Sequence, residues 1–279
     1  MTRSGPDPSS RMPEQWRLIL DSPADGVWNM AVDETLLASV QAGGVPTLRL
    51  YGWRGPWLSL GYAQPLPPGL VSACARAEVG IVRRVTGGAA VLHGADVTYS
   101  LTAPEAALPD GLRASYALVS RALLRALGEL GVSAYPASGP APTTRERPFD
   151  CFERPGQDEI CVGGRKLAGS AQRRAGGAVL QHGSVRLGDD AIPAAQAAGI
   201  APDAATNLAA LGVQVPDRTL RSALVDAFAA ELDVGFEPAT LASEERRMAL
   251  ARYRERRAKP WAPPSQPGLL ASRPPLASR

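Results

Sequence analysis

Alternation of apolar and polar residues predicts a series of short strands in the first third of the chain. Most of these runs are bounded by glycine or proline, as strands that end in tight turns are. The expected strands lie at residues 16–20, 47–51, 57–62 and 79–85. Two later apolar runs, 90–93 and 98–101, are separated by a short polar stretch, and we expect them to pair as a hairpin.

Helical spacing of apolar residues alternates with these strands. Residues 25–40 place Met30, Val32, Leu36 and Leu37 on one side of an expected helix. Residues 112–130 form a long amphipathic pattern, and the alanine-rich section 191–257 also has the composition of helices. Helices are therefore expected on both sides of a strand-rich middle section.

The second group of strands follows a stretch rich in Pro, Thr and Arg at 138–150, which we expect to be a surface loop. Residues 159–162 and 165–171 flank two adjacent glycines, the pattern of a hairpin, and residues 178–185 extend it. Hairpins between flanking helices are typical of an α+β fold. The sequence predicts one domain with a mixed, mostly antiparallel sheet flanked by helices.

Composition sets the limits of this domain. Prolines, serines and arginines dominate residues 261–279 and residues 1–13 are polar, so we expect a disordered leader and tail around a catalytic domain at 14–260. The chain has 45% hydrophobic and 20% charged residues and no apolar run long enough for a bilayer, which favours a cytoplasmic protein without a membrane partner. The net charge of +3 and basic clusters without interleaved aromatic residues give no reason to expect a nucleic-acid partner.

Three cysteines, Cys74, Cys151 and Cys161, lack the C-x-x-C spacing of zinc sites, and we expect free thiols and no metal. Cys74 falls in an amphipathic helical pattern and Cys161 in a strand, where burial is the ordinary outcome. Cys151 differs because it follows the polar loop directly. It is the candidate nucleophile.

Lysine is rare in this chain, since only two of its 30 basic residues are lysines, Lys166 and Lys259. A lysine can lose its proton or act as a compact point charge, which arginine cannot do. Lys166 is therefore a candidate either to favour a thiolate or to take its proton. His93 and His182 are the only histidines, so a Cys-His pair stays open beside a Cys-Lys pair.

A glycine-containing segment begins with Arg83 and Arg84 and continues through Gly87 and Gly88. Adjacent glycines let the backbone approach a ligand and offer N–H groups, for example to an oxyanion. The arginines are suited to an anion or to the acidic face of a carrier protein. A Gly-Gly turn is also common for structural reasons alone.

Five motifs, taken in order, resemble the superfamily of lipoate ligases and octanoyltransferases. They lie at residues 28–34, 49–64, 83–88, 164–172 and 180–184. Residues 92–100, and Cys151-Phe152 ahead of Glu159, are more similar to the LipM-type octanoyltransferases than to the ligases that use ATP.

The resemblance implies the fold of the biotin and lipoate protein ligase catalytic domain. It implies that Cys151 takes octanoyl from acyl carrier protein, with Lys166 in the thioester site, and that no cofactor is needed. The acceptor would be the lysine of a lipoyl domain, in glycine cleavage H protein or a 2-oxoacid dehydrogenase E2. The motif residues expected around the substrate are Arg83, Arg84, Thr86, Gly87, Gly88, His93, Gly169, Ser170, Ala171, His182 and Gly183.

An acyl chain needs an apolar groove, which we expect Val91, Leu167 and Val179 to help line. Three alternatives stay open beside the transferase. The first is an ATP-dependent lipoate ligase, the second an amidotransferase between lipoyl proteins, and the third a non-catalytic module that holds acylated carriers.

Overall fold

The computed structural model describes residues 14–137, 159–199 and 205–263. Its largest sheet has eight strands: β1 (Glu14–Leu20), β2 (Thr47–Tyr51), β6 (Asp96–Pro104), β7 (Tyr135–Pro136), β8 (Ile160–Val162), β9 (Arg165–Ala175), β10 (Ala178–Arg186) and β11 (Val234–Pro238). Their order is β11-β1-β2-β6-β10-β9-β8-β7. Only the β11-β1 and β1-β2 pairs are parallel. The predicted mixed, mostly antiparallel sheet is confirmed.

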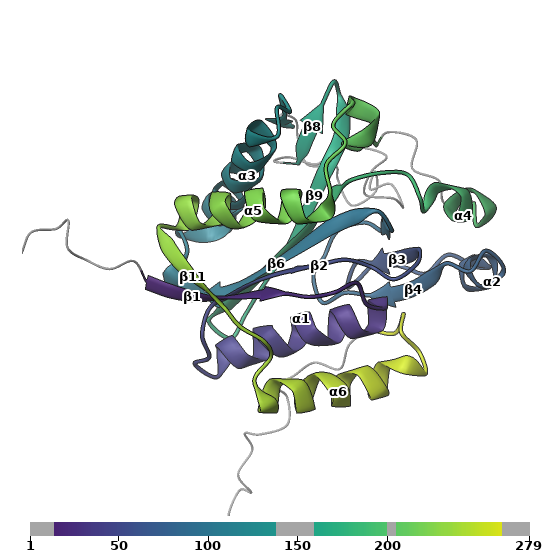
Figure 1. Ribbon diagram of the computed structural model, residues 1–279. Coiled ribbons are helices and arrows are strands. Elements are labelled where there is room, and N and C mark those ends of the chain that lie inside the picture. Colours follow the sequence, from purple (N-terminus) through teal and green to yellow (C-terminus); the bar gives the residue numbers. More distant parts are fainter. Residues whose placement is uncertain (1–13, 138–158, 200–204, 264–279) are drawn as a thin grey trace, which may run out of the picture.

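Long helices cover both faces of this sheet (Figure 1). One face carries α1 (Gly26–Gln41) and α6 (Ser243–Arg257), and the other carries α3 (Gly111–Glu129) and α5 (Asp217–Leu232). The start of α1 is fixed by Asp25, whose carboxylate accepts a hydrogen bond from the amide of Trp28 at 2.9 Å. Among the described residues no helix has the length and apolar character needed to cross a bilayer.

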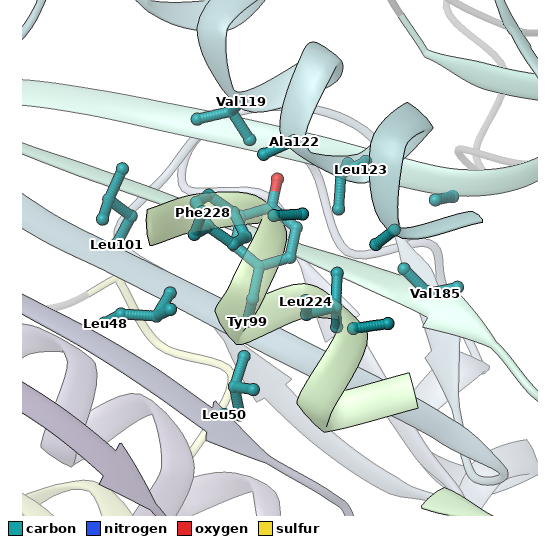
Figure 2. Close-up of a cluster of buried hydrophobic side chains, with 14 of the residues drawn as sticks. Leu48, Leu50, Tyr99, Leu101, Val119, Ala122, Leu123, Val185, Leu224 and Phe228 are labelled. Carbon is teal, nitrogen blue, oxygen red and sulfur yellow. The ribbon is translucent and has the colours of Figure 1, made fainter. Parts of the chain in front are cut away.

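The main hydrophobic core lies between the sheet and the α3-α5 pair (Figure 2). Tyr99 of β6 packs against Phe228 of α5 with ring centroids 5.4 Å apart, and both side chains are fully buried. Burying a phenylalanine contributes about 1.5–3 kcal/mol to folding. Because side chains alternate along a strand, Thr98 and Ser100 point to the opposite face, toward α1. That polar face holds the candidate site.

A second sheet has three strands, β3 (Trp57–Leu60), β4 (Gly80–Arg83) and β5 (Val91–His93), in the order β4-β3-β5. It packs with the short helices α2 (Leu70–Arg76) and α4 (Ile192–Ala197). The predicted hairpin of 90–93 with 98–101 is wrong, because β5 pairs with β3 whereas β6 pairs with β2 and β10. The link between β5 and β6 changes sheets, and the Asp96 carboxylate accepts the Gly94 amide there at 2.7 Å.

Three other features differ from the local pattern. Within the section expected to be helical, β11 pairs with β1 and forms the edge of the large sheet, after Asp233 ends α5 in the left-handed conformation (φ 55°). Strand β9 continues to Ala175 and returns through the Gly176-Gly177 turn. Trp261, assigned by composition to the tail, packs on the core of the small sheet, so the packed domain continues through this residue.

Candidate functional site

A pocket with an empty volume of about 580 Å³ lies on the sheet face that looks toward α1. Pairing register builds its floor, because Tyr51, Thr98, Ser184 and Gly169 stand opposite one another across β2, β6, β10 and β9. The lining residues of the pocket are Met30, Tyr51, Trp53, Ser59, Arg84, Gly88, Val91, His93, Thr98, Glu159, Gly169, Ser170, Ala171, His182, Gly183 and Ser184.

Lys166 lies at the β9 end of the pocket. Its side chain is fully buried, and its ammonium group forms an ion pair with the carboxylate of Glu159, which lines the pocket. A Cβ atom added to Gly169 would lie 2.5 Å from Cε and 2.6 Å from Nζ of Lys166. The glycine therefore makes room for the lysine tip. A buried ammonium beside one carboxylate can stabilise a thiolate or exchange a proton at this end of the pocket.

The described cysteines are both buried, as predicted. Burial raises the pKa of Cys161, and the Glu159 carboxylate adds to this effect, so its thiol stays protonated near neutral pH. Burial also raises the pKa of Cys74. Cys151, the predicted nucleophile, lies outside the described residues.

The opposite end of the pocket is closed by a stacked pair of rings. Trp53 lies on His93 with ring centroids 3.8 Å apart and planes 14° apart. The imidazole Nδ1 lies 3.0 Å from Oδ2 of Asp96, and Nε2 lies 2.9 Å from Oγ of Ser59. The indole Nε1 donates to Oγ1 of Thr98 at 2.8 Å. Both rings are thus held in position by hydrogen bonds as well as by packing.

Burial fixes the charge states at this end. It lowers the pKa of His93, and the nearby Arg84 guanidinium adds to the effect against the opposing attraction of Asp96. Burial alone would raise the pKa of Asp96, but the electrostatic attraction of His93 and hydrogen bonds from His93, Ser184 and the Gly94 amide outweigh it and lower that pKa. The pair is therefore a neutral imidazole beside an ionised carboxylate.

A second carboxylate-imidazole pair supports the wall of the pocket. His182 lies with Nδ1 2.9 Å from Oδ2 of Asp33 and Nε2 2.6 Å from Oγ1 of Thr86. Asp33 also accepts from Arg49 at 2.8 Å and from the Tyr51 hydroxyl at 2.9 Å. Burial opposes ionisation of Asp33, but the His182 hydrogen bond and the Arg49 charge outweigh it and lower its pKa. This chain ties α1, β2 and β10 to the glycine-containing turn.

Arg84 holds the backbone of the glycine-containing turn by hydrogen bonds. Its side chain is buried and donates to the carbonyl oxygens of Ser59 at 2.7 Å, Gly87 at 2.8 Å and Ala89 at 2.7 Å. A Cβ atom at Gly61 would overlap the carbonyl oxygen of Gly88. The turn is therefore pressed against the end of β3, and only a glycine fits at Gly61.

Arg83 has a similar structural use outside the pocket lining. Its guanidinium donates to the carbonyl oxygens of Gly61 at 2.6 Å, Gln64 at 2.7 Å and Trp261 at 2.6 Å. These contacts with main-chain oxygens hold three segments of chain together. The anion-holding role expected from the sequence stays a prediction for both arginines.

The structure brings most predicted site residues together. Eight of them line the pocket: Arg84, Gly88, His93, Gly169, Ser170, Ala171, His182 and Gly183. Arg83, Thr86 and Gly87 lie outside its lining, and Lys166 reaches its edge through Glu159. For the apolar groove, Val91 lines the pocket, but Leu167 and Val179 belong to the main core with α3 and α5. The expectation for those two residues is wrong because their side chains do not point into the pocket.

Sequence reasoning missed five residues that build the site: Asp33, Ser59, Trp53, Asp96 and Glu159. Asp33, Trp53 and Ser59 fall inside the family motifs at residues 28–34 and 49–64, and Asp96 follows His93 by three residues. Each is a polar or aromatic residue within or beside an apolar run. Local pattern alone does not distinguish such a residue from one in an ordinary turn or on the surface.

Comparison with known proteins places this geometry in a family. The model of the lipoyl protein ligase A/B catalytic domain matches residues 25–229. Octanoyltransferase LipM of Moorella thermoacetica is 45% identical over 185 residues, which cover 63% of this chain and 68% of that protein. Octanoyltransferase LipM of Kyrpidia tusciae is 37% identical over 267 residues, covering 86% and 96%.

The fold also matches solved structures. A lipoate-protein ligase A bound with ATP superposes with a TM-score of 0.72 at 22% identity, covering 86% of this chain and 95% of that chain. This likeness concerns the fold alone, whereas the family model and the sequence relatives show the family. The chain belongs to the lipoyl protein ligase A/B catalytic domain family, as one of its octanoyltransferases.

Proposed function

We propose that the enzyme takes octanoyl from acyl carrier protein onto Cys151 and passes it to the lysine of a lipoyl domain without a nucleotide. The observation that supports this most is the buried Lys166 ammonium, paired with Glu159 at one end of the pocket. A fixed cation beside a thiol favours the thiolate, which is the nucleophile. The Gly169 cradle keeps that cation at the edge of the space where an acyl group fits.

The proposed reaction has two steps. The Cys151 thiolate attacks the thioester carbonyl, so an enzyme C–S bond forms while the carrier C–S bond breaks, and the carrier thiolate takes the proton that the Cys151 thiol released. The acceptor amine next attacks the new thioester, so a C–N bond forms, the enzyme C–S bond breaks and the amine proton passes to Sγ. Thioester exchange is nearly neutral in free energy and amide formation is downhill, so no ATP is required.

The acyl chain is proposed to lie across the strands, from β9 toward β2. The floor residues Gly169, Ser184, Thr98 and Tyr51 span four strands, which is about 14 Å at the usual strand spacing. An extended octanoyl chain is about 9 Å long, given ordinary C–C bond lengths. It fits this space with its tail against the Trp53 ring.

The acceptor class is a lipoyl domain, with glycine cleavage H protein and 2-oxoacid dehydrogenase E2 as candidates, and the reaction is placed in the cytoplasm. An amidotransferase would draw octanoyl from one lipoyl protein instead of from the carrier. An ATP-dependent ligase would start from a free acid. The donor therefore distinguishes the three activities.

The test supplies a purified lipoyl domain with one of three donors: octanoyl-acyl carrier protein, an octanoylated H protein, or octanoate with ATP. Mass spectrometry of the acceptor is expected to show octanoylation with the first donor and without ATP. Transfer from the octanoylated H protein alone would replace the proposal with the amidotransferase. Modification only with ATP and free acid would replace it with the ligase.

A further inference from the structure

A second groove lies along β9, on the same face of the sheet as the pocket. Gly169 and Ala171 line the pocket, and Arg173 and Ala175, at the next alternate positions, line the groove. The groove runs between α1, α6 and the β9-β10 turn, and its empty volume of about 1,960 Å³ includes its open mouth. The molecule therefore offers two spaces on the same face of β9, one directed across the strands and one along β9.

The groove is positively charged. Its lining holds Arg173, Arg252, Arg256 and Lys259 against the carboxylates of Glu34 and Glu255. Glu34 lies between Arg252, at 3.9 Å, and Arg256, so these two arginines share one carboxylate. Burial raises the pKa of Glu34 to about 7, which weakens even that negative charge. An anion is the ligand that this lining favours.

Arg173 is the groove residue of β9 that lies two positions beyond the pocket residue Ala171. One of its Nη atoms donates to the Val85 carbonyl oxygen at 3.1 Å, and its guanidinium lies 5.2 Å from the centroid of the Tyr62 ring. These contacts hold the side chain over the groove. Lys259, at the end of α6, is exposed and lines the same groove.

We propose that this groove binds the phosphodiester and pantetheine part of the arm that carries the octanoyl thioester on acyl carrier protein, with Arg173 and Lys259 contacting the phosphate. The inference rests on the proposed function, because only a phosphopantetheine donor brings this group. The dimensions agree. The four residue steps along β9 from Gly169 to Arg173 span about 13 Å, and the extended arm from sulfur to phosphorus is about 16 Å long at ordinary bond lengths.

The test compares two small donors that differ in one group, octanoyl-phosphopantetheine and octanoyl-pantetheine, with the lipoyl domain as acceptor. In the wild type, kcat/KM is expected to be at least about tenfold higher for the phosphorylated donor, since charge-assisted hydrogen bonds to phosphate are the strong ones. Arg173→Gln and Lys259→Gln should each lower this ratio, and the double variant should bring it close to one.

The matched control is Arg247→Gln, which removes an exposed charge from α6 outside the groove lining and should leave the ratio unchanged. A wild-type ratio near one, or an unchanged ratio in the double variant, would overturn the groove assignment while transfer itself still supports the proposed function. Absence of transfer from both donors, with activity from octanoate and ATP, would instead overturn the proposed function.

The same arm also occurs in coenzyme A, so octanoyl-coenzyme A and octanoyl-acyl carrier protein are compared in a second assay. The double variant is expected to lose kcat/KM by about tenfold with the carrier donor. A loss with coenzyme A alone would overturn the assignment to the carrier.

Discussion

The two ends of the pocket are built on different principles. At the β2 end, Asp96 accepts hydrogen bonds from His93, Thr98, Ser184 and the Gly94 amide, and the rings stack. At the β9 end one buried cation, Lys166, pairs with a carboxylate beside a glycine. The first end holds two stacked rings in a fixed shape, whereas the second places a buried ammonium group at the edge of the pocket. Changes at the β9 end should therefore affect the reaction, and changes at the β2 end should affect selectivity and stability.

The largest effect is expected from Lys166→Gln. Loss of the buried cation should lower kcat by about 10²- to 10³-fold, the usual effect of removing one fixed electrostatic group from an active site. Steady-state transfer assays measure it, with thermal unfolding as the control for folding. Lys166→Arg should restore little, because the space beside Gly169 fits the lysine tip. Activity within tenfold of the wild type in Lys166→Gln would contradict the role of this cation.

A smaller loss is expected from Gly169→Ala at the same end. The new Cβ atom would displace the Lys166 tip, and kcat should fall about tenfold, as misplacement of a catalytic group does. The matched control is Gly128→Ala in α3, because an added Cβ at Gly128 meets no atom within 4 Å. Equal effects of the two substitutions would show that packing around Lys166 is unimportant.

At the β2 end, Trp53→Leu should change selectivity. Removing the ring opens space where the acyl tail ends, so the kcat/KM ratio of decanoyl to octanoyl donor should rise about tenfold, given about 0.8 kcal/mol per buried CH₂. Trp57→Leu, outside the pocket lining, serves as the control. An unchanged ratio in Trp53→Leu would mean that the acyl tail lies elsewhere.

The smallest effect concerns pH. Burial lowers the pKa of His93 below its ordinary value, so below about pH 6.5 the unfolded chain binds a proton that the folded protein does not. The free energy of unfolding should therefore fall as pH decreases below that value, by at most about 1.4 kcal/mol per pH unit for one proton. Urea unfolding at several pH values checks this.

Glu34 changes the free energy of unfolding with pH in the opposite direction to His93. Its pKa is raised to about 7, so the folded state holds a proton between pH 4.5 and 7 and stability from this group is lost as pH rises. The difference between the wild type and His93→Gln isolates the histidine. Identical pH slopes in both proteins would show that His93 does not titrate differently on folding.

Much of the architecture follows from local pattern. Strand alternation and the helical spacing at residues 25–40 predict β1, β2 and α1 closely, because their apolar residues recur with the period of a strand or a helix. The pairing of β5 with β3, and of β11 with β1, depends on contacts between segments far apart in the chain, which local pattern does not contain. Errors in strand pairing are expected wherever the chain passes from one sheet to another.

The site shows the same division. The glycine motifs and Lys166 can be recognised from the sequence, because adjacent glycines and a rare lysine stand out from their surroundings. Asp33 carries little, although it is the centre of the chain that links Arg49 to His182. Its importance comes from a partner 149 residues away, which only the fold reveals.

The central claim is that an acyl thioester forms on Cys151. The most direct measurement is intact-protein mass spectrometry after mixing the enzyme with octanoyl-acyl carrier protein and no ATP, with Cys151→Ala and Cys161→Ala alongside. The account predicts a hydroxylamine-labile octanoyl adduct on the wild type and on Cys161→Ala, and none on Cys151→Ala. An adduct that persists in Cys151→Ala, or transfer to the lipoyl domain at the wild-type rate by that variant, would contradict it.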